Sequence, residues 1–162
     1  MSHPDGLPDL FLDRSLGRLQ VPRLLRDAGQ RLVTLAEQHG IPSDEDVPDI
    51  DWLELAGTEG WAVFLKDARI RSRAVERETV QAFGVRWFCI TRQDLTAAQM
   101  LERYLKHLDE IAAACSESDP FIYAVHERRI ERLHLDSYAR APDEAALQAM
   151  MNMLSKFPKL RL

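Results

Sequence analysis

The chain has only two cysteines and seven glycines, and it has no long apolar run. Its two cysteines, Cys89 and Cys115, stand in apolar stretches without a CxxC or Cys/His spacing, so we expect small buried residues rather than a disulfide or a zinc site. Its glycines form no glycine-rich phosphate loop, which argues against a nucleotide-binding kinase. No segment approaches the roughly 20 apolar residues of a membrane span, and the N-terminus lacks a signal core. We therefore expect a cytoplasmic protein.

Patterns that would indicate common hydrolases are also missing. The five histidines show no HxxxH or HxH spacing, which argues against a zinc site or a histidine-based nuclease. His126 and His134 are expected at polar positions on exposed strands. Ser15 and Ser72 lack the glycine context of a nucleophile elbow. With 21 Lys and Arg against 26 Asp and Glu, the net charge is −5, so any attraction to a polyanion must be local.

What the chain does have is an alternation of apolar runs and helical patterns over its 162 residues. The expected strands are Leu10–Leu12, Arg31–Ala36, Trp61–Leu65, Val85–Ile90, Pro120–Val125 and Ile130–Leu135, the last two forming a hairpin around Glu127–Arg129. Five helices are expected. The first contains Pro22, the second begins at Asp49 and ends near Gly57 or Gly60, the third spans Ala74–Phe83, the fourth runs from Thr96 to Ile111, and the last begins at Pro142. This alternation predicts one α/β domain with a central, mostly parallel sheet and helices on both faces.

Three aspartates occupy matching places in this pattern. Asp13 closes the first strand, Asp67 follows the third, and Asp49 opens a helix. Because parallel connections put successive strand ends at one edge of the sheet, Asp13 and Asp67 should lie together there, and Asp49 joins them if its helix starts at that edge. Carboxylates bind hard divalent cations, which can activate water for phosphodiester cleavage. The alternatives are an ordinary N-cap at Asp49 and turn-stabilising roles for the other two aspartates.

Basic residues cluster immediately beyond the third strand. Lys66, Arg69 and Arg71, followed by Arg73 and Arg77, could hold the phosphates of a nucleic acid beside an acidic pocket. The alternative is a solvated helix face whose arginines pair with neighbouring glutamates.

Other positions have both a functional and a structural interpretation. Arg14, next to the first aspartate, could bind phosphate in the same way as the basic cluster. Thr91, at the end of the fourth strand, either holds a water near the metal or is a plain strand-end threonine. The three tryptophans lie in apolar runs and are expected in the core.

Several short motifs recur together in a known family. The motifs are Phe11–Gly17, Val21-Pro22, Asp49–Ala56, Phe64–Ile70 and Leu95-Thr96. Together they resemble the PIN-like nucleases, most closely the VapC-related PIN-like proteins of bacterial toxin–antitoxin pairs. The resemblance runs from about residue 9 to residue 125. It implies a three-layer PIN-like sandwich that binds Mg²⁺ or Mn²⁺ through Asp13, Asp49 and Asp67 and cuts RNA. It also implies a cognate antitoxin as partner and allows self-association into a homo-oligomer.

The chain departs from the family pattern in one respect. PIN domains usually carry a further acid, often glutamate, between the first two of these aspartates, and no acid stands at a clean match. Asp51, Glu54 and Asp94 are the candidates to replace it. The departure leaves open a non-catalytic module that binds a partner protein or RNA, and the metal chemistry leaves open a nuclease or phosphatase acting on DNA or small phosphoesters. Residues 126–162 would form a C-terminal extension to the domain.

Overall fold

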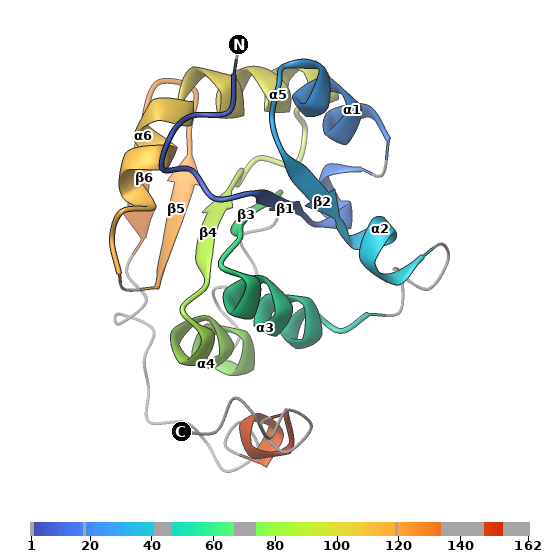
Figure 1. The fold of residues 1–162 in the computed structure, drawn as a ribbon, viewed down its shortest axis with the longest axis vertical. Coiled ribbons are helices and arrows are strands. Elements are labelled where there is room, and N and C mark those ends of the chain that lie inside the picture. Colours follow the sequence, from blue (N-terminus) through green and yellow to red (C-terminus); the bar gives the residue numbers. More distant parts are fainter. Residues whose placement is uncertain are drawn as a thin grey trace.

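A six-stranded sheet lies at the centre of the molecule. The computed structural model describes residues 2–17, 19–40, 47–66, 74–118, 120–133 and 148–153. The strand order is β2-β1-β3-β4-β5-β6, with β1 to β5 parallel to one another and β6 antiparallel to β5 (Figure 1). The strands are β1 Leu10–Leu12, β2 Leu32–Thr34, β3 Ala62–Leu65, β4 Arg86–Cys89, β5 Phe121–Val125 and β6 Ile130–Leu133. The expected mostly parallel sheet and its final hairpin are confirmed.

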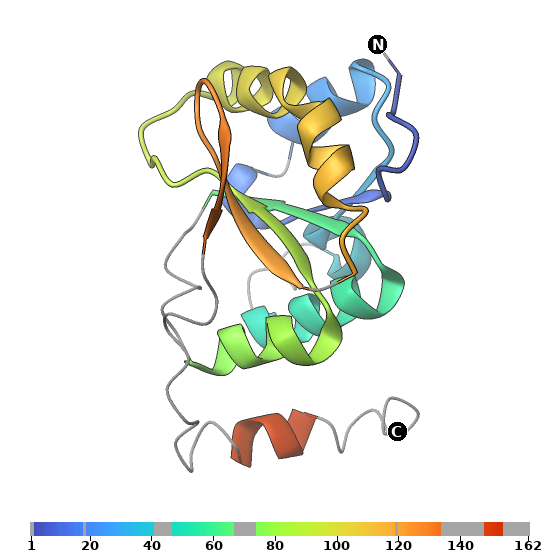
Figure 2. The same cartoon turned by 90° about the vertical axis from the view of Figure 1, so that its left-hand side faces the viewer.

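Helices cover both faces of this sheet, so the fold has three layers. They are the 3-10 helix η1 Arg14–Leu16 and the α-helices α1 Gln20–Asp27, α2 Leu35–His39, α3 Asp49–Glu59, α4 Ala74–Phe83, α5 Ala97–Lys106 and α6 Leu108–Ala114. Helices α1, α5 and α6 pack on one face, and α3 and α4 pack on the other (Figure 2). Residues 148–153 are also helical and lie beyond the layer of α3 and α4 (Figure 2). Within the described ranges, no helix is both long and apolar enough to cross a membrane.

The strands bury both of their faces. In β1, Leu10 and Leu12 face the core under α1 and α5, while Phe11 faces α3. Phe64 of β3 stacks on Tyr104 of α5, with ring centroids 4.0 Å apart. Continuous apolar runs, rather than alternating ones, are the pattern of strands in a parallel sheet that is covered on both sides.

The expected core positions of Trp52 and Trp87 and the buried roles of both cysteines are confirmed. Trp52 and Trp87 are fully buried, whereas Trp61 is partly buried against the core, where it stacks on Phe11 at 5.5 Å. Both cysteines are free and buried. Burial raises the pKa of the Cys115 thiol to about 11, so this thiol stays protonated and unreactive at neutral pH.

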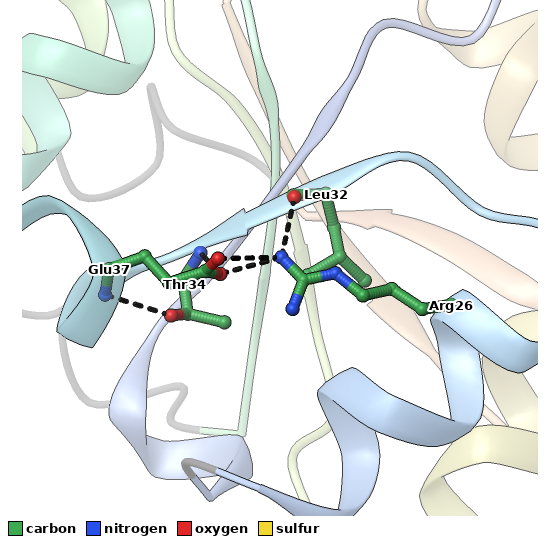
Figure 3. A network of polar contacts seen from close by, with 4 residues as sticks. All are labelled: Arg26, Leu32, Thr34 and Glu37. Atoms are coloured by element: carbon green, nitrogen blue, oxygen red, sulfur yellow. Dashed lines mark hydrogen bonds and ion pairs between the residues drawn. The ribbon is translucent and has the colours of Figure 1, made fainter.

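The expectation of a strand over Arg31–Ala36 is wrong in its second half. Strand β2 ends at Thr34, and α2 starts at Leu35. The Thr34 hydroxyl accepts a hydrogen bond from the Glu37 N–H at 3.1 Å, and the Glu37 carboxylate accepts one from the Thr34 N–H at 3.0 Å (Figure 3). This reciprocal capping box outweighs the β propensity of the apolar run, and its Thr-x-x-Glu signature was present in the sequence.

The expected single helix from Thr96 to Ile111 is two helices that meet at His107. Its backbone leaves the helical conformation at φ −107° and ψ 13°. Its ring is buried and lies 3.1 Å from the carbonyl oxygen of His126, which ties the junction to the β5–β6 turn. The apolar stripe continues through the break because α5 and α6 pack on the same face of the sheet. His126 itself lies just after β5 rather than within the strand, and His134 lies outside the described residues.

Helix α3 ends at the second of the two glycines considered for its stop. Gly60 adopts the left-handed conformation with φ +75° and closes the helix. Gly57 lies inside α3, where an added Cβ would overlap the carbonyl oxygen of Phe83 in α4. Gly57 therefore allows the close contact between α3 and α4.

Candidate metal centre

Asp13 lies where β1 ends against β3. Its N–H donates to the carbonyl oxygen of Phe64 at 3.2 Å, so its backbone still belongs to the edge of the sheet. Its carboxylate caps η1 by accepting the Ser15 N–H at 3.3 Å. The residue is only 7% exposed. The turn-stabilising role considered for Asp13 is thus present, but it places a carboxylate in a largely buried position.

Asp49 is the first residue of α3, and Pro48 occupies the N-cap position. The interpretation of Asp49 as an N-cap is therefore wrong. Its carboxylate instead accepts a hydrogen bond from the indole Nε1 of Trp52 at 3.0 Å. Because Trp52 is fully buried and stacks on Phe11, this bond orients Asp49 relative to the core.

The negative charge of Asp49 acts on the carboxylate of Asp13. The pKa of Asp13 is raised above its ordinary value, mainly by burial, and the negative charge of Asp49 raises it further, while hydrogen bonds from Ser15 lower it. Like charges held together at a partly desolvated position disfavour the ionised form. We refer to Asp13 and Asp49 as the acid pair.

The third expected acid, Asp67, lies outside the described residues. The residue before it is held at both of its backbone polar groups. The Lys66 N–H donates to the Ser15 hydroxyl oxygen at 2.9 Å, and the Lys66 carbonyl accepts from the Gln93 side chain at 3.0 Å. The chain therefore leaves β3 beside the turn that carries Asp13.

The end of β3 is also held by the sheet and by α5. The Leu65 carbonyl oxygen accepts from the Ile90 N–H at 2.9 Å. The Tyr104 hydroxyl lies 3.1 Å from this oxygen and 3.0 Å from the carbonyl oxygen of Phe88. Tyr104 is fully buried, so it forms a rigid support beneath the strand ends.

The acid pair suits a hard divalent cation. Its donors are carboxylate oxygens, the ligands that Mg²⁺ and Mn²⁺ prefer, and a bound cation would offset both the burial of Asp13 and its repulsion from Asp49. Within the described part of the chain, no three His, Cys, Asp or Glu side chains gather closely enough to hold a metal. The expected third ligand, Asp67, is not among those residues.

Comparison with known proteins identifies the family. A model of the PIN-like domain matches residues 8–92, a range that includes the acid pair. The chain belongs to the PIN-like domain family. It is also 47% identical, over 127 residues, to a protein of Mycobacterium tuberculosis named "Putative ribonuclease VapC45", and the match covers 78% of this chain and 92% of that relative. No solved structure matches the chain.

Two of the four expected RNA-binding residues, Lys66 and Arg14, are among the described residues. Arg69 and Arg71 lie outside the described residues, and the Lys66 side chain is partly buried. Arg14 is exposed in η1, the turn that Asp13 caps. Lys66 directly follows β3 and bonds Ser15 of this turn, and Arg14 lies within the turn next to Asp13.

The acids considered as replacements for the family glutamate have different surroundings. Asp94 is exposed and forms an ion pair with Arg92, with oxygen–nitrogen distances of 2.9 and 2.5 Å, and this hydrogen bonding holds its pKa below the ordinary value. Asp51 is partly buried in the first turn of α3, and Glu54 is buried on the same helix. Thr91 is partly buried shortly after β4 ends.

Sequence reasoning missed the groups that surround Asp13. Ser15 was considered only as a nucleophile, yet its N–H binds Asp13 and its hydroxyl oxygen binds the Lys66 N–H. The Asp-x-Ser spacing is a local signal for such a side chain to backbone contact. Gln93 had no comparable signal, because its partner Lys66 lies 27 residues away in the chain.

Proposed function

We propose that this PIN-like protein is a metal-dependent endoribonuclease and the toxin of a toxin–antitoxin pair. The observation that carries the proposal is the acid pair, in which Asp13 is buried at the carboxyl end of β1 and is acted on by the charge of Asp49, the first residue of α3. The identity of 47% with a relative whose name includes ribonuclease supports the same activity.

Asp13 and Asp49, together with Asp67, would hold Mg²⁺ or Mn²⁺. When bound, such an ion supplies Lewis acidity toward a phosphodiester and activates water for its hydrolysis. The protein contributes the placement of the oxygens: Ser15 fixes Asp13 from within its own turn, and Trp52 fixes Asp49. Ligands that are oriented before binding avoid part of the ordering cost when the ion and the substrate arrive.

The substrate and the partners follow from charge. Lys66, Arg69, Arg71 and Arg14 would hold the phosphates that flank the scissile bond, which offsets the negative charge of the whole chain. A cognate antitoxin would inhibit the enzyme by occupying the acidic pocket or covering these cations. Such a toxin meets its RNA in the cytoplasm, and a homo-oligomer is compatible with this role.

The test compares two aspartate-to-asparagine variants. Asp13→Asn should lower RNA cleavage at least ~100-fold, because it removes a charged ligand while leaving an acceptor for Ser15. Asp27→Asn, at the exposed end of α1, should cleave like the wild type and serves as the matched control. Cleavage is measured on labelled RNA over a Mn²⁺ series. If Asp13→Asn cuts RNA as fast as the control with the same metal dependence, the proposal is overturned.

A further inference from the structure

We propose that Gln93 is a positioning residue for the acid pair and acts on Asp13 through Lys66 and Ser15. The inference rests on the proposed metal-dependent function and adds a residue to it. Gln93 lies in the loop between β4 and α5, and its side chain crosses to the end of β3. It thereby links the ends of two neighbouring strands at the edge of the sheet where Asp13 lies.

Three successive hydrogen bonds make the connection. The Gln93 side-chain amide donates to the Lys66 carbonyl at 3.0 Å. The Lys66 N–H donates to the Ser15 hydroxyl oxygen at 2.9 Å. The Ser15 N–H in turn donates to the Asp13 carboxylate at 3.3 Å. We call these four residues the Gln93–Asp13 chain.

Ser15 joins the two ends of this chain. Its hydroxyl oxygen accepts the Lys66 N–H, and its own N–H donates to the carboxylate of Asp13. The orientation of Asp13 therefore depends on where the Lys66 backbone lies, and Gln93 holds that backbone by donating to the Lys66 carbonyl.

The sheet does not need Gln93 to stay together. The end of β3 is already bonded to Ile90 through the Leu65 carbonyl, and Tyr104 reaches the carbonyl oxygens of Leu65 and Phe88 from the core. Gln93 itself is exposed. An exposed side chain that bonds the next residue, Lys66, adds little to folding but restricts the position of the turn that carries Asp13.

Gln93→Met tests the proposal because methionine has a similar length and no donor. Groups that orient metal ligands typically affect metal affinity by 10–100-fold. Because Gln93 acts through two intermediates, we expect Gln93→Met to weaken Mn²⁺ binding by about 10-fold, at the low end of that range. Isothermal titration of Mn²⁺ into the full chain measures this affinity, and the melting temperature should stay within roughly 1 °C of the wild-type value.

The matched control is Gln81→Met. Gln81 is an exposed glutamine on α4, close to where the chain enters β4 and so at the opposite end of that strand from Gln93. It should bind Mn²⁺ like the wild type. A second readout needs no metal: amide hydrogen exchange in the metal-free protein should speed up at Lys66 in Gln93→Met, while the amides of Val63 and Phe64 stay protected.

The outcomes separate this inference from the proposed function. If the wild type binds Mn²⁺, Asp13→Asn does not, and Gln93→Met binds like Gln81→Met, the positioning role is overturned and the metal-dependent function stands. A fall in melting temperature and general loss of amide protection in Gln93→Met would show a purely structural role and also overturn the inference. If the wild type fails to bind Mn²⁺ at millimolar concentration, the proposed function falls, and the inference falls with it.

Discussion

Two carboxylates near the ends of neighbouring parallel strands have opposite electrostatic surroundings. Strand β1 is followed by Asp13, and β2 is followed by α2, whose first turn carries Glu37. The two strands pair in register, with Leu12 opposite Thr34. Both carboxylates lie beyond the carboxyl ends of their strands and both accept a hydrogen bond as part of a helix cap. They differ in the charge that each one faces.

Glu37 faces a cation. Its two oxygens lie 2.6 and 2.9 Å from one terminal nitrogen of Arg26, which also donates to the Leu32 carbonyl at 3.1 Å (Figure 3). Burial alone would raise the pKa of Glu37, but the hydrogen bonds from Arg26 and Thr34 outweigh it and hold the pKa below the ordinary value.

Asp13 faces another carboxylate. Its pKa is raised by burial and by the charge of Asp49, and its hydrogen bonds to Ser15 involve a neutral residue. An acid already paired with arginine serves the fold, whereas a buried acid whose ionised form is disfavoured by a second acid fits the metal ligand proposed above. The predictions below test this difference.

The largest contrast should appear in stabilisation by metal. At a free Mn²⁺ concentration about 100 times the dissociation constant, binding to the native state alone adds ~2.7 kcal/mol to the free energy of unfolding. The wild type and Glu37→Gln should both gain this amount, and Asp13→Asn should gain none. Thermal unfolding with and without Mn²⁺ measures the effect. An equal gain in Asp13→Asn would place the metal elsewhere.

A smaller effect is expected from the cap of α2. Thr34→Ala removes the hydroxyl that accepts the Glu37 N–H and should lower the free energy of unfolding by ~1 kcal/mol. Thr34→Ser keeps the acceptor and should restore most of the loss. Urea denaturation measures both variants. Since this acid serves the fold, RNA cleavage by Thr34→Ala should match the wild type at a temperature where both are folded, and a selective loss of cleavage would contradict the comparison.

The smallest effects concern the charges themselves. Glu37 and Arg26 are each nearly half exposed, so Glu37→Gln should cost only about 0.5 kcal/mol at pH 7. Because folding lowers the pKa of Glu37 from 4.5, its contribution is present above pH 4.5 and is lost as the pH falls through the lower folded value. The cost of Glu37→Gln should therefore disappear in acid.

In the metal-free protein, Asp13→Asn should change the stability in the opposite direction to Glu37→Gln. Neutralising a carboxylate whose charged form is disfavoured by burial and by Asp49 should raise the melting temperature at pH 7. Scanning calorimetry in the presence of a chelator compares the two variants. A lower melting temperature for Asp13→Asn would show that its charge is compensated in the fold, as the charge of Glu37 is.

Much of the architecture could be predicted because apolar runs and glycines carry local information. The run Ala62–Leu65 is buried on both faces, and such continuous runs indicate a parallel sheet. The errors arose where one pattern fits two structures. An apolar run that ends in a Thr-x-x-Glu cap predicts a strand by composition but starts a helix at Leu35. The stripe around His107 has the same period whether it belongs to one helix or to two on the same face.

The candidate site could be predicted from the sequence as far as the order of strands and helices determines it. Parallel strands place their carboxyl ends at a common edge, which is why Asp13 and Asp49 could be chosen before any coordinates. Neither the burial of Asp13 nor the bond from Trp52 to Asp49 could be predicted. Both depend on how α3 packs against β1, which no local pattern specifies.

The sequence by itself therefore determined the layers, the strand direction and the acids at the edge of the sheet, because periodicity and turn residues act over a few neighbouring positions. Only the tertiary structure decided which acid is paired with arginine and which faces a second acid. Charge interactions depend on distance through space, and the contact between Gln93 and Lys66, 27 positions apart, exists only once β3 and β4 lie side by side.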